Sequence, residues 1–349
     1  MSVNDTPRVK PVQSSKRFMS IQYLRGIAAL MVVLTHSSIY LEQIYGDNSL
    51  RVVFGDYWSY FGVIIFFCIS GFLLTSLAMK TRWLVFILHR CVRIFPLYFM
   101  VLLLLVIAMW LSGRAIPALD WRILLLIPIG PETYRPLHVE WTLVYEVAYY
   151  FILTFFCMVA FRRHLLIFYI VWFLMLTFIF LTGRTFGHHM LPHGWAVYLT
   201  SWNIAFILGG FAWMLYDRQY LKWWSGLLGT VLILSCTIHP MATVFFAPVG
   251  VSLLIAYFIQ REQQAKTPFQ SNILECLGNW SYAIYLVHVP ILLAVLPVFL
   301  NRGHSLLSAW FCSLGLILLG SACLGQMDLL VYRKLKKRID VAFIRKEMT

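Results

Sequence analysis

Charged residues are scarce in this chain, and acidic residues are the scarcest. Only 12% of the 349 residues are charged, with 14 Asp and Glu against 28 Lys and Arg, whereas 61% are hydrophobic. The mean hydropathy of +0.78 also lies far from that of soluble globular domains. The composition therefore excludes a water-soluble protein and predicts one whose solvent is largely lipid.

Motifs of several well-known chemistries are also missing. The seven cysteines stand without CxxC pairs or His partners, so we expect reduced packing residues, with no disulfide framework and no metal site. The chain contains no P-loop, GxSxG elbow or HExxH sequence. Phosphate-loop, hydrolase-elbow and zinc-protease chemistries therefore have no support. We also find no internal repeat and no low-complexity linker.

Apolar runs of about 20 residues recur along the chain, and each can cross the roughly 30 Å hydrocarbon layer as a helix. They predict an all-α, polytopic transmembrane helical bundle of about ten spans. The predicted spans lie near residues 20–41, 58–79, 94–112, 139–160, 165–182, 195–215, 223–238, 244–260, 277–299 and 306–331. We expect one membrane domain over residues 18–332, between a basic N-terminal segment at 1–17 and a basic tail at 333–349.

Basic residues are unevenly divided among the segments that connect these spans. If the amino terminus is cytoplasmic, the loops on the opposite side keep only Arg51, Arg114, Arg122, Arg135, Arg184 and Arg302. This bias follows the positive-inside rule and predicts a multi-pass protein of the inner (plasma) membrane with both termini in the cytoplasm. Topology and contact with membrane lipid thus explain the formal charge of +14, and no nucleic-acid partner is expected.

Two segments depart from the pattern of simple spans. Residues 80–93 mix basic and aromatic side chains and are too short to cross, so they predict an amphipathic helix on the cytoplasmic surface. Residues 122–138 contain a short apolar piece broken by Pro and Gly. This piece predicts a half-helix that enters the membrane from the outer side.

Ionisable residues inside the spans are rare, and each is a candidate for function because it costs roughly 2.5–3.5 kcal/mol at mid-span. Arg25 and His36 stand eleven residues apart in the first run. Eleven residues are close to three helical turns, or about 16 Å, so both side chains are predicted to face one groove. The alternative is an Arg that snorkels to the surface and a His bonded to a neighbouring helix.

Glu146 lies inside the fourth predicted span, where a carboxylate needs a partner. Thr142, Tyr149 and Tyr150 share its helical face and surround the acid with hydroxyl groups. The carboxylate could therefore orient an imidazole or pair with an Arg. The alternative is a structural hydrogen bond that holds helices together.

A third polar stripe lies near the end of the chain. Ser281, Tyr285 and His288 fall at i, i+4 and i+7, just before Pro290, which loosens the helix. A single buried His is often structural, but its polar company favours a lined cavity.

Residues near the cytoplasmic ends of two spans complete the set of candidates. Arg90 and Arg93 share a helical face beside His89, and guanidinium pairs bind phosphate oxygens well. The alternative is that these residues only set topology and touch lipid phosphates. Ser70 and Gly71 interrupt an apolar span, where small residues allow either a ligand or another helix to approach closely.

In this order, these fragments resemble the acyltransferase-3 family of integral membrane O-acyltransferases. The resemblance covers nearly the whole chain, and five fragments carry it. They are Arg25 with His36; FFCISGFLL, with Ser70 and Gly71; RCVRIFPLY, with Arg90 and Arg93; WTLVYEVAYY, with Glu146 and Tyr150; and NWSYAIYLVHVP, with Ser281, Tyr285 and His288. Within the family, the chain resembles the compact branch that acetylates exopolysaccharides.

The resemblance implies transfer of an acyl group, with acetyl expected, from cytoplasmic acyl-CoA to a hydroxyl of an exopolysaccharide or lipid-linked glycan. On this expectation Arg25, Arg90 and Arg93 hold the acyl-CoA, with Ser70 and Gly71 beside its arm. The expected catalytic residues are His36 and Glu146, and the expected contacts to substrate or oxyanion are Tyr150, Ser281, Tyr285 and His288.

Two other classes of protein share some of these features. A secondary transporter or a flippase for a lipid-linked glycan would also have about ten helices and a few buried ionisable groups, but such folds are commonly built from repeated halves. A non-enzymatic membrane scaffold would leave the cost of burying Arg25, His36 and Glu146 unexplained.

Overall fold

The computed structural model describes residues 18–113, 115, 120–183, 191–236, 243–265 and 271–348. These residues form helices and no named strand, which confirms the predicted all-α class. The helices are α1 (Met19–Tyr45), α2 (Ser49–Val53), α3 (Asp56–Lys80), α4 (Trp83–Leu111), α5 (Trp121–Leu124), α6 (Trp141–Phe156), α7 (Val159–Arg162), α8 (Leu165–Leu181), the 3₁₀ helix η1 (Gly194–Leu199), α9 (Asn203–Asp217), α10 (Trp223–Ser235), α11 (Thr243–Gln264), α12 (Asn272–Asn301) and α13 (Leu306–Met348). The predicted segment 1–17 lies outside the described residues.

Six of these helices are long and apolar enough to cross a membrane, namely α1, α3, α4, α11, α12 and α13. The helices α6, α8 and α10 are apolar but shorter, with 16, 17 and 13 residues. Since a helix rises about 1.5 Å per residue, 13 residues reach only about 20 Å. The run predicted near 195–215 divides into η1 and the 15-residue α9. The order of the apolar helices is thus confirmed, whereas four of them are shorter than a full crossing.

The predicted interfacial helix at 80–93 is not a separate element. Residues from Trp83 onward form the first three turns of α4, which continues without a break through Pro96 to Leu111. The basic residues of this part lie within the helix, and two of them pair with carboxylates of α13. His89 pairs with Asp340 at 2.9 Å, and Arg93 pairs with Asp328 at 2.6 Å.

The basic tail and the predicted half-helix also differ from the simple expectation. The tail is helical, but it continues α13 without a boundary near residue 333. The predicted half-helix at 122–138 is wrong in its backbone, because only α5 is helical and Pro and Gly residues break the remainder. Some of its apolar side chains nevertheless pack inside, with Leu126 and Leu137 at most 1% exposed, whereas Leu124 and Leu125 are 36% and 50% exposed.

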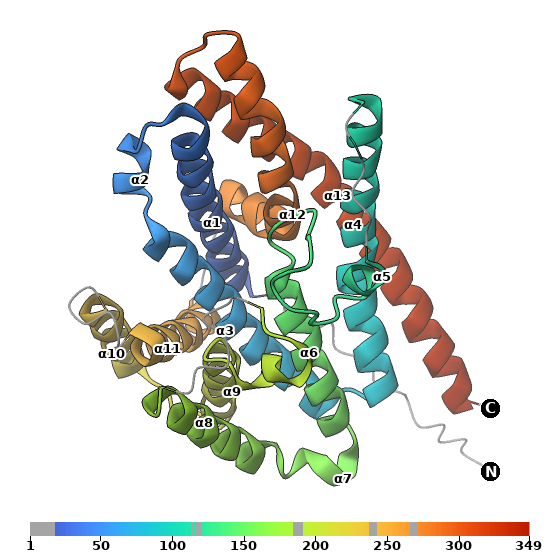
Figure 1. The fold of residues 1–349 in the computed structure, drawn as a ribbon. Helices are drawn as coiled ribbons and strands as arrows, with labels where there is room; N and C mark the ends of the chain where they lie inside the picture. Colours follow the sequence, from blue (N-terminus) through green and yellow to red (C-terminus); the bar gives the residue numbers. More distant parts are fainter. Residues whose placement is uncertain are drawn as a thin grey trace, which may run out of the picture.

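Helix α1 is central to the arrangement and packs against α12 and α3 (Figure 1). Its close approach to α12 depends on glycine, because a Cβ at Gly26 would collide with Leu277, and one at Gly278 would collide with the backbone of Gln22. The N-terminus of α1 is capped by Glu262 of α11, whose carboxylate accepts hydrogen bonds from two backbone N–H groups at 2.7 and 2.9 Å. These contacts fix the position of the residues that α1 carries.

Helix α3 packs in a similar way against α9. A Cβ at Gly71 would collide with the carbonyl of Phe206, and one at Gly209 would collide with the carbonyl of Cys68. Gly71 therefore serves the packing of two helices, and the other side of α3 is the side that faces α1, α6 and α4.

Candidate active site

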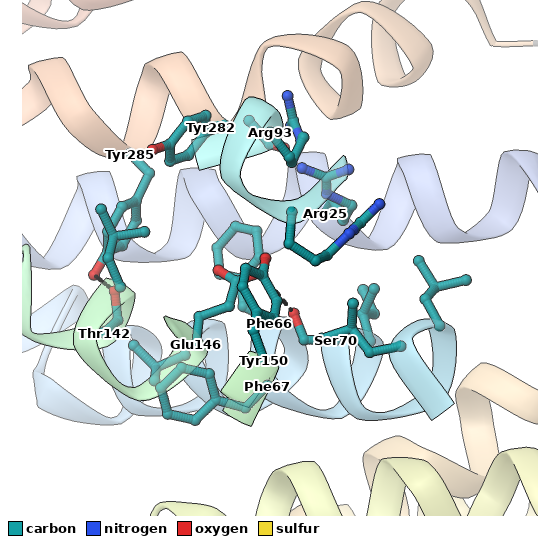
Figure 2. A pocket seen from close by; sticks show the side chains of 17 residues that line it. Arg25, Phe66, Phe67, Ser70, Arg93, Thr142, Glu146, Tyr150, Tyr282 and Tyr285 are labelled. Carbon is teal, nitrogen blue, oxygen red and sulfur yellow. Dashed lines mark hydrogen bonds between the residues drawn. The ribbon is translucent and has the colours of Figure 1, made fainter. Parts of the chain in front are cut away.

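A cavity of about 120 Å³ lies among α1, α3, α4, α6 and α12. Figure 2 shows its polar lining, with Arg25 and Arg93 towards one end and Tyr285 with Thr142 towards the other. Glu146 lies between these ends, and Ser70 lies below Arg25 in this view. The complete lining is Arg25, Val63, Phe66, Phe67, Ile69, Ser70, Leu73, Leu74, Arg90, Arg93, Thr142, Leu143, Glu146, Tyr150, Ser281, Tyr282 and Tyr285.

Most of the residues predicted from the sequence meet in this one cavity, although they come from five helices. The predicted residues that line it are Arg25, Ser70, Arg90, Arg93, Glu146, Tyr150, Ser281 and Tyr285. Three predicted residues are not in the lining: Gly71, which packs against α9, and the two histidines His36 and His288.

Arg93 is held by an acidic partner that the sequence analysis did not single out. Its Nη1 donates to Oδ2 of Asp328 at 2.6 Å, and the Asp328 side chain is only 2% exposed. The guanidinium also lies 5.2 Å from the ring centre of Tyr282 and 5.8 Å from that of Tyr332. Arg93 is therefore fixed by an ion pair and two aromatic faces, and its charge is largely compensated.

The remaining two arginines leave positive charge in the cavity. Nε of Arg90 is buried and has no hydrogen-bond partner among the described residues. Arg25 lies within electrostatic reach of Arg93 and Glu146. Three guanidinium groups thus face two carboxylates, those of Glu146 and Asp328, so this end of the cavity favours an anionic ligand.

Glu146 has partners inside the cavity. Its Oε1 accepts a hydrogen bond from the hydroxyl of Tyr150 at 2.6 Å and a longer one from Ser70 at 3.4 Å. Tyr150 is one turn further along the same helix, so the i, i+4 spacing supplies the partner. The expectation that Glu146 orients the imidazole of His36 is not met, because the two side chains lie in different places and neither bonds to the other.

The far end of the cavity is closed by Tyr285. Its hydroxyl accepts from Thr142 at 2.8 Å and donates to the carbonyl of Val139 at 3.1 Å, and its ring lies 6.0 Å from that of Phe66. Because the single hydroxyl hydrogen goes to Val139, Tyr285 has no free donor for an oxyanion in this arrangement. The same holds for Ser281, which donates to Gly278 of its own helix at 2.8 Å.

The two histidines lie directly beyond this closed end. The ring of His288 is 5.8 Å from that of Tyr285 and 5.1 Å from that of His36. Arg25 lines the cavity and His36 does not, so the structure does not show the single open groove that the sequence predicted for both. Three turns do separate them along α1, but Tyr285, with Phe66 against it, stands between the cavity and the histidines.

Comparison with known proteins agrees with the resemblance seen in the sequence. A family model described as an acyltransferase domain matches residues 19–326. The chain belongs to the acyltransferase-3 family. It is therefore a membrane acyltransferase, and the match spans all five helices that line the cavity. Comparison with curated proteins and with solved structures gave no match.

The turn of this acyltransferase that carries His36 is firmly anchored. Thr35 and Ser38 are fully buried, and their hydroxyls donate to the carbonyls of Gly55 and Phe54 at 3.3 and 3.0 Å. Ser37 accepts a hydrogen bond from the indole of Trp310 at 2.9 Å. The side chain of His36 is therefore presented from a helical turn that two other segments, the loop before α3 and α13, hold in place.

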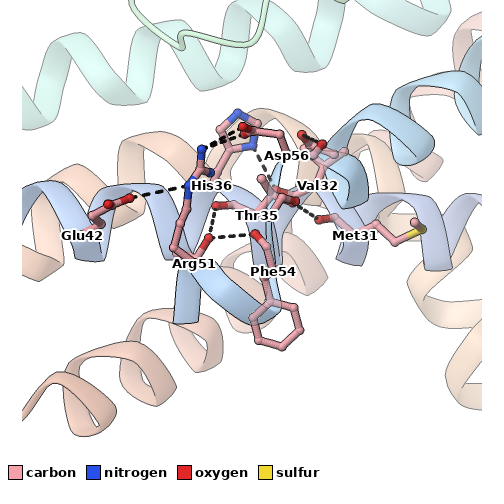
Figure 3. Close-up of polar contacts among 11 residues, drawn as sticks. Met31, Val32, Thr35, His36, Glu42, Arg51, Phe54 and Asp56 are labelled. Carbon is pink, nitrogen blue, oxygen red and sulfur yellow. Dashed lines mark hydrogen bonds and ion pairs between the residues drawn. The ribbon is translucent and has the colours of Figure 1, made fainter. Parts of the chain in front are cut away.

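Charged groups surround the outer part of this turn. Figure 3 shows His36 bonded to Val32, with Arg51 and Asp56 nearby. Arg51 pairs with Asp56 at 2.9 Å and with Glu42 at 3.5 Å. The Asp56 side chain is 75% exposed, so this end of the acyltransferase is polar and exposed.

Two residues of the acyltransferase site were missed by the sequence analysis as site residues. Asp328 lies inside the last predicted span, and the rule that a buried carboxylate needs a partner could have identified it. Tyr282 lines the cavity, and its hydroxyl donates to the carbonyl of Ile94 at 2.9 Å. No helical spacing relates α12 to α4, so only the packing of the two helices reveals that contact.

Proposed function

We propose that this acyltransferase moves an acyl group, in the first instance acetyl, from cytoplasmic acyl-CoA to a hydroxyl of an exopolysaccharide or a lipid-linked glycan. One observation carries the proposal. A cavity with excess positive charge at Arg25 and Arg90 leads to Tyr285, and two imidazoles lie directly behind that ring. A thioester donor is anionic at one end and reactive at the other, which suits this polarity.

The donor's phosphates are assigned to Arg25 and Arg90, since Arg93 is already paired with Asp328. The cavity volume of about 120 Å³ is below the roughly 300–1,000 Å³ of sites that enclose a drug-sized ligand. It can therefore hold a narrow arm but not a nucleotide. On this proposal the nucleotide stays at the cytoplasmic mouth, and the pantetheine arm lies beside Ser70.

The chemical step is assigned to His36 as a general base. The sugar hydroxyl attacks the thioester carbon, its proton moves to the imidazole, the C–O bond forms, and the C–S bond breaks. The thiolate of CoA then receives the proton, so the products are the ester and free CoA. A positioned base of this kind contributes roughly 10²–10⁴-fold in rate.

This step requires movement at the closed end of the cavity. Tyr285 and Phe66 must separate before the thioester can reach His36, because their two rings close the cavity on that side. Rotation of Tyr285 would also free its hydroxyl from Val139 and Thr142. Glu146, bonded to Tyr150, is then assigned to balancing the arginine charges rather than to orienting the base.

The orientation in the membrane follows the charge bias of the sequence. We place the arginine end of the cavity and both termini on the cytoplasmic side of the inner membrane, because basic residues concentrate there. The exposed groups near His36, including Asp56, then face the compartment from which the glycan acceptor arrives.

The test is purified protein in lipid with radiolabelled acetyl-CoA and a glycan acceptor. The proposal predicts CoA release that depends on the acceptor hydroxyl and appearance of label in the glycan as an ester. Movement of the glycan across the bilayer without thioester consumption would instead support a flippase. If neither the glycan nor a lipid-linked oligosaccharide acquires the label, the proposed class of acceptor is wrong.

A further inference from the structure

We propose that His288 is a positioning residue that, together with the carbonyl of Val32, holds a hydrogen on Nδ1 of His36, so that Nε2 of His36 is the nitrogen that takes the proton. The inference rests on the proposed function only in naming His36 as the base. The inference is argued from the hydrogen bonds of the two imidazole rings, because these bonds fix which ring nitrogen holds a hydrogen.

Both rings direct Nδ1 at a backbone carbonyl of their own helix. Nδ1 of His36 lies 3.0 Å from the carbonyl oxygen of Val32, and Nδ1 of His288 lies 3.2 Å from that of Ile284. A carbonyl oxygen can only accept, so each Nδ1 must carry a hydrogen. A neutral imidazole then has its lone pair on Nε2.

The contact between the rings agrees with this count. Nε2 of His288 lies 3.4 Å from Nδ1 of His36. With the hydrogens on Nδ1, His288 accepts at Nε2, and the hydrogen of His36 is shared between Val32 and His288. Such three-centre bonds are common at helix carbonyls. No hydrogen bond among the described residues engages Nε2 of His36.

The opposite arrangement has two repulsive contacts. If His288 donated from Nε2, Nδ1 of His36 would hold a lone pair facing the carbonyl oxygen of Val32 at 3.0 Å. The lone pair on Nδ1 of His288 would then face the oxygen of Ile284 at 3.2 Å. Each buried acceptor that is left without a hydrogen bond costs roughly 1–3 kcal/mol. The arrangement with hydrogens on both Nδ1 atoms is therefore favoured.

The arrangement also suits the charge that appears during the reaction. When Nε2 of His36 takes the proton, the ring becomes an imidazolium, and its Nδ1 hydrogen faces two acceptors, Val32 and His288. A neutral imidazole thus takes the orienting place that a carboxylate holds in other catalytic arrangements. His288 itself is 0% exposed and uses both nitrogens, so it acts through His36.

The tautomer can be measured without any activity assay. Full-length protein labelled with ¹⁵N-histidine in lipid should show His36 with a protonated Nδ1 and an unprotonated Nε2, the signals being assigned from their loss in His36→Gln. In His288→Leu, Val32 alone accepts this hydrogen, so a fraction of His36 should shift to the Nε2 tautomer. A proton on Nε2 of His36 in the wild type, or an unchanged tautomer in His288→Leu, would overturn the inference.

Activity gives the second readout, because Gln offers an amide oxygen near the place of Nε2. We expect kcat to fall roughly 100-fold in His288→Leu, within the range of a positioned base, with KM for acetyl-CoA unchanged, and to recover at least tenfold in His288→Gln. His304→Gln, at an exposed loop, is the matched control. Equal kcat for the Leu and Gln variants contradicts positioning by hydrogen bonding. Absence of transfer in the wild type rejects the proposed function, while the ¹⁵N spectrum still tests the tautomer.

Discussion

The two ends of the α1 and α12 pair use opposite electrostatic designs. At one end, Arg25 lines a cavity with two further arginines and Glu146, and Asp328 pairs with one of these arginines, Arg93. At the other end, His36 and His288 meet as two rings whose hydrogen bonds are made to backbone carbonyls and to each other. The same two helices thus carry both a cluster of guanidinium groups and a pair of imidazoles.

The difference teaches how one bundle can separate binding from proton transfer. An anionic donor is attracted by unbalanced charge, whereas a base must remain neutral until it takes the proton. Placing Tyr285 between the two ends keeps the arginines away from the imidazoles. The following substitutions test each end and the residue between them.

The largest expected effect is at the imidazole end. His36→Ala should lower kcat for O-acylation by roughly 10²–10⁴-fold, because the proton acceptor is lost, while membrane insertion and acetyl-CoA binding remain. Initial rates with purified protein measure this, with His304→Ala as the control. Undiminished rates in His36→Ala would remove this residue from the mechanism.

The next effect is on stability at the arginine end. Asp328→Ala should lower the free energy of unfolding by about 3–5 kcal/mol, because Arg93 is left buried without its partner. Thermal unfolding in detergent measures the loss. The double variant Arg93→Met with Asp328→Leu should recover most of it, and an unchanged melting temperature in Asp328→Ala would show that the ion pair is not needed.

A smaller and more selective effect is expected for Arg90. Arg90→Ala should raise KM for acetyl-CoA roughly tenfold with kcat unchanged, since a hydrogen bond to a charged group contributes about 1.5–3 kcal/mol. Arg218→Ala, an exposed residue at the end of α9, is the matched control. If both variants give the same KM, Arg90 only sets topology.

The smallest effect is expected for the residue between the two ends. Tyr285→Phe removes the hydroxyl that bonds to Thr142 and Val139, and each such bond contributes about 1 kcal/mol. We expect kcat to change roughly fivefold, with KM for acetyl-CoA nearly constant. A change confined to KM would place the tyrosine in donor binding instead.

Much of the bundle could be predicted because lipid imposes a simple rule on sequence. Each predicted span corresponds to a helical segment in the right order, since apolar runs have no other stable form in a membrane. The lengths of the helices could be predicted less well. The run at 80–93 continues into α4, and its His89 and Arg93 pair with Asp340 and Asp328, which are more than 200 residues away in sequence.

For the site, residue type was more informative than spacing. The cost of buried charge pointed to Arg25 and Glu146, and the affinity of guanidinium pairs for phosphate pointed to Arg90 and Arg93; all four line the cavity. Spacing along α1 could not reveal that Tyr285 of α12 interrupts the groove. Partner choice was equally hidden, because the pairing of Arg93 with Asp328 depends on how α13 packs against α4.

The central claim is that a donor held by the arginines reaches the imidazole of His36, and a structure with a non-hydrolysable acetyl-CoA analogue tests it most directly. We predict phosphates at Arg25 and Arg90, the arm beside Ser70, and the acetyl carbonyl past a displaced Tyr285, next to His36. An acetyl group that stays on the arginine side, with Tyr285 still bonded to Val139, would contradict the account.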